Sequence, residues 1–238
     1  MRSFILAFVV LAALALLVVP YFVLPPVLEN LVARNVQDRL GLAEQPAVEL
    51  DSDPQWEMLL GEFSSGRVSA GETDLGGVRA EDVSMDLDPF SVDVGESVQS
   101  RTAVAERPVS GRVRLTVSEG EISRLARQNA DTPVNGVELD RGGVTVESEA
   151  SFLGATFPVE VDGGVGVEGN ALVFEPGTVR AAGMTVPPDL ADSLLAGTAF
   201  RYPVEGLPYG ARITGAETIE GAVALTGRVT GVELGRGS

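Results

Sequence analysis

The stretch Leu24–Leu40, LPPVLENLVARNVQDRL, predicts the helix around which the rest of the chain folds. Its apolar residues recur in steps of three and four, at Val27, Leu28, Leu31, Val32, Val36 and Leu40. Because this spacing places apolar side chains on one face, it indicates an amphipathic helix from Val27 to Leu40. Pro25-Pro26 precedes the helix and Gly41 follows it, as helix boundaries favour.

An uncharged apolar run, SFILAFVVLAALALLVVPYFVL, occupies Ser3–Leu24. About twenty apolar residues suffice to cross a bilayer core as a helix. Arg2 supplies the positive flank that stays cytoplasmic, so residues 26–238 are expected to form an extracytoplasmic domain. Bulky residues at the exit of the run favour a retained single-pass anchor over residues 1–25. Pro20 would interrupt the last turn, and the alternative is a cleaved signal that leaves a secreted or periplasmic domain.

The composition restricts the chemistry that the chain can perform. It carries 34 acidic and 17 basic residues, a net charge of −17, with no histidine or cysteine, and every cation is arginine. These absences exclude an imidazole base, a thiolate nucleophile or zinc site, and a lysine Schiff base. A carboxylate hydrolase stays open, but it needs two carboxyl groups converging across a cleft. We therefore expect no enzyme, no cofactor, no metal and no nucleic-acid partner.

Most of the remaining sequence alternates with a period of two, which is typical of strands in a sheet covered on one face. Alternation runs through residues 82–87, 112–117, 144–146, 157–161 and 223–229. Short helices are expected at Trp56–Leu60, after a capping box of Ser118 and Glu121, and from Pro187 through Leu190, Leu194 and Leu195. Gly-Gly pairs predict turns at residues 76–77, 142–143 and 163–164. The fold class is α+β, with a long, curved antiparallel sheet wrapped around the amphipathic helix.

Four blocks of the sequence share the character of one known family: LPPVLENLVARNVQDRL (24–40), the segment from LLGEFSSGRVS (59–69) to SMDLDPFSVD (84–93), VRLTVSEGEISRLARQ (113–128) and LPYGARITGAETIEGAVALTGRVTGVEL (207–234). Together they resemble the actinobacterial lipomannan elongation factor A-like (LmeA) phospholipid-binding family. One departure is DPQW (53–56), where a more apolar stretch is expected. The resemblance implies a tubular lipid-binding fold with an apolar groove. It also implies phospholipid binding in support of cell-envelope lipid or lipoglycan assembly, without catalytic residues.

The groove expected from this resemblance would be lined by the helix stripe and by aromatic residues. The candidates are Leu28, Leu31, Val32, Val36, Phe63, Phe152, Phe157, Phe174, Leu194 and Phe200. An arginine at the mouth would pair with a lipid phosphate, and the candidates are Arg112, Arg114, Arg201 and Arg212. Ordinary core packing and a solvated strand face explain the same residues. The alternative function is a structural or protein-interaction domain with a solid core, and the sequence identifies no protein partner.

Overall fold

The structure, a computed structural model, describes residues 26–38, 41–75, 77–130, 133–152, 155–187, 191, 200–204 and 207–233. These residues form two compact units. Unit 1 draws on residues 1–70, 84–112 and 230–238, and unit 2 on residues 71–83 and 113–229. The expected anchor in residues 1–25 lies outside the described residues. Among the described residues, no helix is both long and apolar enough to cross a membrane.

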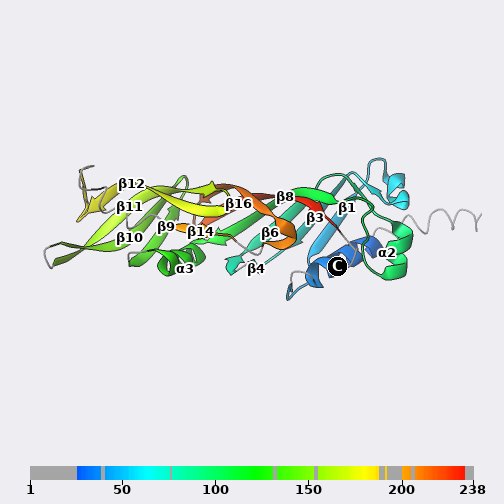
Figure 1. The fold of residues 1–238 in the computed structure, drawn as a ribbon, viewed down its shortest axis with the longest axis horizontal. Helices are drawn as coiled ribbons and strands as arrows, with labels where there is room; N and C mark the ends of the chain where they lie inside the picture. The colour runs from blue at the N-terminus through cyan, green and yellow to red at the C-terminus, as the bar shows by residue number, and fades with distance from the viewer. Residues whose placement is uncertain are drawn as a thin grey trace, which may run out of the picture. The chain divides into compact units, whose positions relative to one another are not determined.

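Unit 1 consists of short helices and an antiparallel sheet (Figure 1). Its strands run side by side in the order β1-β3-β6-β8, and β2 pairs with β7. The elements are a helix over residues 26–38, β1 (Ala47–Asp51), η1 (Gln55–Leu60), β2 (Glu62–Phe63), β3 (Ser65–Ala70), β6 (Asp82–Leu87), β7 (Phe90–Ser91), α2 (Val94–Ser100) and the first residues of β8 (Val109–Ser118).

The core of unit 1 lies between the N-terminal helix (residues 26–38) and the sheet. Val32 and Val36 pack with Val68 of β3, with Met85 of β6 at the edge of the cluster. One turn earlier, Leu28 joins a second cluster with Leu50, Phe63, Phe90, Val92, Ala105 and Val109. The predicted amphipathic helix is confirmed over the residues described. Leu28, Val32 and Val36 of its stripe are buried in the core, whereas Val27 is 39% exposed.

Unit 2 contains a six-stranded antiparallel sheet in the order β13-β12-β11-β10-β9, with β14 also paired to β12. Consecutive strands β9 to β12 form a meander, visible as the long ribbons of Figure 1. Within this unit the later residues of β8 lie beside β16, which pairs with β15. The elements are β4 (Thr73–Leu75), β5 (Val78–Ala80), α3 (Glu119–Asn129), β9 (Val134–Asp140), β10 (Gly143–Phe152), β11 (Ala155–Glu168), β12 (Ala171–Ala181), β13 (Met184–Thr185), β14 (Arg201–Pro203), η2 (Pro208–Gly210), β15 (Arg212–Ile219) and β16 (Ala222–Val232).

The α+β class with mainly antiparallel strands is confirmed, and the predicted helix at Trp56–Leu60 is the 3-10 helix η1. The expectation of one dominant sheet is corrected, because the β9–β14 sheet of unit 2 is separate from the strands that pack on the N-terminal helix. The helix expected from Pro187 falls mostly on residues that are not described.

Two local predictions are also corrected. Ser118 is the N-cap of α3, but its side chain makes no capping hydrogen bond. Glu121 instead accepts a hydrogen bond from the backbone of Arg79 (2.9 Å). Gly163-Gly164 is not a turn: both residues lie inside β11, at a β-bulge where the register shifts between Asp162 and Gly163.

Candidate functional site

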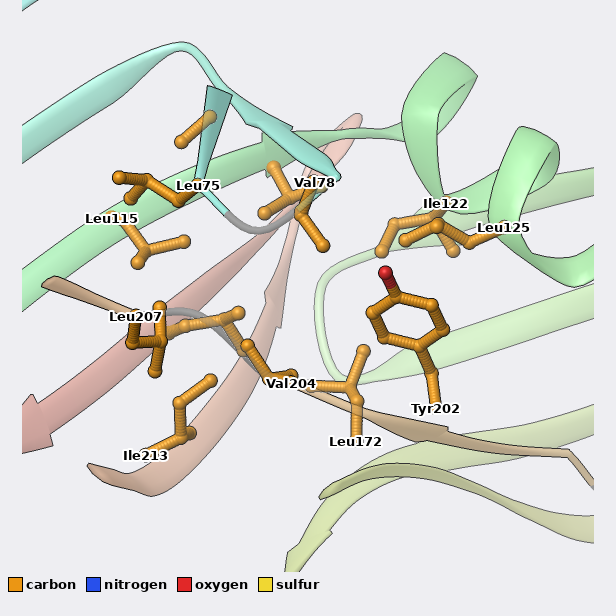
Figure 2. A pocket seen from close by; sticks show the side chains of 13 residues that line it. Leu75, Val78, Leu115, Ile122, Leu125, Leu172, Tyr202, Val204, Leu207 and Ile213 are labelled. Carbon is orange, nitrogen blue, oxygen red and sulfur yellow. The ribbon is translucent and has the colours of Figure 1, made fainter. Parts of the chain in front are cut away.

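An apolar pocket lies within unit 2, between α3 and strands of the two larger sheets (Figure 2). These strands are β8, β15 and β16 of one sheet and β12 and β14 of the other. Each strand contributes residues from its apolar face, because alternate side chains point the same way. The lining residues are Leu75, Val78, Ala80, Leu115, Val117, Ile122, Leu125, Leu172, Tyr202, Val204, Leu207, Ile213 and Leu225. Apart from the Tyr202 hydroxyl, these side chains carry no polar atom, so the pocket suits hydrocarbon.

The exposed side chains of the lining indicate where the mouth of the pocket lies. Among the lining residues, Tyr202 and Leu207 are partly exposed and the others are buried. The volume inside is about 10 Å³, on the scale that holds one water molecule. An acyl chain therefore enters only if lining side chains move apart, and the partly exposed Tyr202 and Leu207 are the side chains with room to move.

The side-chain amide of Asn170 forms two hydrogen bonds to segments that line the pocket. Asn170 lies between β11 and β12, and its Nδ2 donates to the carbonyl oxygen of Val204 (2.6 Å). Its Oδ1 accepts from the backbone N–H of Ile213 (2.9 Å), at the start of β15. Asn170 thus connects the segment after β14 with β15, and both carry lining residues.

The ion pair of Arg124 and Glu121 lies beside the mouth of the pocket. Arg124 of α3 donates from Nε to Glu121 Oε2 (2.8 Å) and from Nη2 to the carbonyl oxygen of Gly77 (2.7 Å). The Tyr202 hydroxyl lies 3.7 Å from the position that a Cβ on Gly77 would occupy, and Figure 2 shows it directed toward Ile122 and Leu125. A guanidinium and a phenol hydroxyl therefore border an apolar pocket.

The ion pair shifts the pKa of both partners. The hydrogen bond from Arg124 lowers the pKa of Glu121 and outweighs the opposing effect of burial, with further lowering from the Arg79 backbone N–H. The same hydrogen bond raises the pKa of Arg124. Both groups are charged at neutral pH, and Arg124, 40% exposed, keeps part of its guanidinium open to solvent.

The groove residues expected from sequence are distributed over both units, and none of those whose side chains the structure describes lines this pocket. Leu28, Leu31 and Phe63 belong to one cluster of unit 1, where Phe63 stacks on Phe90 with 5.1 Å between ring centroids. Val32 and Val36 belong to the other cluster of unit 1.

The remaining groove candidates belong to unit 2 or fall outside the description. Phe174 and Phe200 are buried and stack with 5.8 Å between ring centroids, and Phe157 is partly buried. Phe152 ends β10, but its side chain is not described, and Leu194 lies outside the described residues.

The four predicted headgroup arginines are all exposed on strands. Arg201 of β14 pairs with Glu168, the last residue of β11 (2.7 Å). Arg112 and Arg114 lie on the outward face of β8, opposite the side that Leu115 and Val117 turn to the pocket. The arginine beside the mouth is Arg124, which the sequence analysis did not select.

The sequence patterns predicted some of the strands and helices that line the pocket, but they did not predict that these elements form a pocket. The alternation of β8 contains Leu115 and Val117, and the stripe of α3 contains Ile122 and Leu125. Leu207 belongs to the LPYG segment singled out for its resemblance. No pattern along the chain pairs these residues with Leu75, Leu172 or Val204. In the described part of the chain, no group of three or more acidic side chains is arranged to hold a metal ion.

A model of the LmeA-like phospholipid-binding family matches residues 19–228. No curated protein and no solved structure matches the chain. The matched range contains the N-terminal helix and every lining residue of the pocket.

Proposed function

Since the chain belongs to the LmeA-like phospholipid-binding family, we propose that it is a membrane-tethered, extracytoplasmic protein that holds a phospholipid acyl chain in the pocket of unit 2. The observation that supports this site is an almost wholly apolar lining that ends at a mouth with one arginine and one tyrosine hydroxyl. Acyl chains match the lining, because each buried methylene contributes about 0.8 kcal/mol. The headgroup phosphate would remain at the mouth and accept hydrogen bonds from Arg124.

The tether and the physiological role are further parts of this proposal. The uncharged run Ser3–Leu24 supports a retained anchor, which would keep the domain close to its lipid source. The role would be support of cell-envelope lipid or lipoglycan assembly. The mass of the chain isolated from membranes tests the anchor, since cleavage near residue 25 removes the whole run.

The binding site is tested by blocking the mouth. Leu207→Trp adds bulk at the partly exposed edge of the pocket, whereas Ile219→Trp adds the same bulk on an exposed residue of β15 that does not line it. We expect phospholipid to co-purify with the unaltered protein and with Ile219→Trp, and to be depleted in Leu207→Trp, by native mass spectrometry and lipid extraction. Ligand-free unaltered protein that also takes up nothing from liposomes would refute the proposal.

A second candidate function is a structural or protein-interaction domain with a packed interior. The observation that favours it is the pocket volume of about 10 Å³, which is small for a ligand site. The two candidates differ in how the pocket responds to lipid. A spin-labelled phospholipid that becomes immobilised on the protein, and is displaced by unlabelled phospholipid, supports the lipid-binding candidate.

A further inference from the structure

Three exposed apolar side chains lie on η1 and α2 of unit 1. Trp56 is 56% exposed, Leu60 65% and Val98 51%. We call these three residues the Trp56 patch. Figure 1 shows the short cyan helix η1 and the labelled α2 at the same end of unit 1. Single exposed apolar residues are ordinary on protein surfaces, but groups of them on neighbouring elements that include a tryptophan mark a contact surface.

The two elements of the patch are fixed to each other. The backbone N–H of Val92 donates to the carbonyl oxygen of Gly61 (2.8 Å), directly after η1. A Cβ on Gly61 would collide with the Val92 carbonyl oxygen and would lie 3.0 Å from Val94 Cγ2. Val98 follows Val94 by one helical turn, so it lies on the same face of α2. The patch is therefore presented by a packed scaffold.

One element of the patch, η1, also packs against the start of the N-terminal helix, which the apolar run Ser3–Leu24 precedes in the sequence. Met58 of η1 packs against the cluster that contains Leu28, in the first turn of the N-terminal helix. Leu28 follows Leu24 by four positions in the chain, so the backbone between them spans at most ~14 Å. If the run sits in a bilayer, the bilayer surface is near η1 and α2.

The charges on η1 and α2 themselves do not favour anionic lipids, although the exposed Arg101 follows α2 as its C-cap. Neither η1 (QWEMLL) nor α2 (VGESVQS) contains an arginine, and each carries one acid, Glu57 and Glu96. Tryptophan concentrates at membrane interfaces because its ring is apolar and its N–H is polar. The chemistry of the patch thus fits the boundary between headgroups and acyl chains.

We propose that Trp56, Leu60 and Val98 form a membrane-docking surface that inserts into the interface of the bilayer holding residues 3–24. The proposal rests on the tether in the proposed function, but not on lipid binding in the pocket of unit 2. Docking would give unit 1 a second attachment beside the anchor. Since the attachment is apolar, it is insensitive to salt, unlike an electrostatic one.

Trp56 is the single tryptophan of the chain, so its fluorescence reports on the patch alone. The full chain, residues 1–238, is reconstituted in phosphatidylcholine vesicles with or without bromine on the acyl chains. We expect the brominated vesicles to quench Trp56 at low and at high salt. The double variant Leu60→Asp/Val98→Asp should lose most of the quenching. Met184→Asp, which alters a 72% exposed side chain of unit 2, should keep it.

Three results would overturn the docking surface. One is emission that brominated lipid leaves unchanged while aqueous iodide quenches it fully. Another is a blue-shifted emission that depends on the protein-to-lipid ratio but not on bromine, which indicates contact with a second copy. The third is equal quenching in the double variant. Phospholipid co-purification is measured on the same proteins before reconstitution, because the vesicles themselves supply phospholipid. Unaltered protein that carries no phospholipid but is quenched refutes the pocket, whereas phospholipid retained with quenching absent refutes the docking surface.

Discussion

Asn170 and Val204 are joined by two hydrogen bonds, one from the Val204 N–H to the Asn170 carbonyl oxygen (3.0 Å) and one from Asn170 Nδ2 to the Val204 carbonyl oxygen (2.6 Å). With the bond that Asn170 Oδ1 accepts from the Ile213 N–H, this pairing holds two lining segments of the pocket. The Asn170 side chain therefore adds two hydrogen bonds to the backbone pairing that holds the wall around Val204.

Asn170→Ala should destabilise unit 2 by about 1–3 kcal/mol, because it leaves the Val204 carbonyl oxygen and the Ile213 N–H without the side-chain partners they have now. Urea unfolding measures this loss. Asn135→Ala is the matched control, since Asn135 is exposed and its side chain makes a 3.4 Å contact with Glu149. Equal midpoints for the two variants would show that the Asn170 amide does not hold the wall.

Glu121→Gln should destabilise the protein by about 1–2 kcal/mol at pH 7, since it removes the charge that pairs with the partly exposed Arg124. The pKa of Glu121 is lowered in the folded protein, so its stabilisation is complete above pH 4.5, the ordinary value, and is lost as the pH falls through the lowered pKa. The difference in unfolding free energy between wild type and variant should accordingly shrink below pH 4.5. A difference that stays constant down to pH 3 would contradict this pairing.

Glu29→Gln should have the opposite effect. Burial raises the pKa of Glu29, with smaller raising contributions from Glu49 and Asp51 against a lowering hydrogen bond from the Leu50 backbone. Ionised Glu29 therefore destabilises the folded state at neutral pH, and wild-type stability rises as the pH falls through the raised pKa toward 4.5.

The variant should be more stable than wild type at pH 7, by less than about 1 kcal/mol because Glu29 is only partly buried. This advantage should vanish near pH 4.5, as measured by denaturant unfolding across the pH range. Glu106→Gln, on an exposed carboxylate, is the control and should shift stability little at either pH. A variant less stable than wild type at pH 7 would refute the assignment.

The pattern along the sequence predicted the helices and strands better than it predicted which of them lie in contact. The stripe of Leu28, Val32 and Val36 identified the buried face of the N-terminal helix because a helix repeats every 3.6 residues. The pocket was missed because its parts meet through contacts such as those of Asn170, whose partners are 34 and 43 positions away. Local periodicity carries no information on which strand faces which.

The pair Gly163-Gly164 shows the same limit and supplies the sharpest test of the structure. Two adjacent glycines indicated a turn, yet they lie within β11 opposite Pro176 and Glu175, directly after the register shift between Asp162 and Gly163. A Cβ on Gly163 would collide with the Glu175 carbonyl oxygen and would lie 2.8 Å from the Phe174 ring, whereas a Cβ on Gly164 would meet nothing within 4 Å.

Gly163→Ala should therefore lower the stability of the folded protein by about 1–3 kcal/mol through overpacking. Gly164→Ala should be neutral or stabilise by up to about 1 kcal/mol, because it reduces the entropy of the unfolded chain. Thermal unfolding of the two variants decides the matter, and equal melting temperatures would mean that the bulge is not where the structure has it.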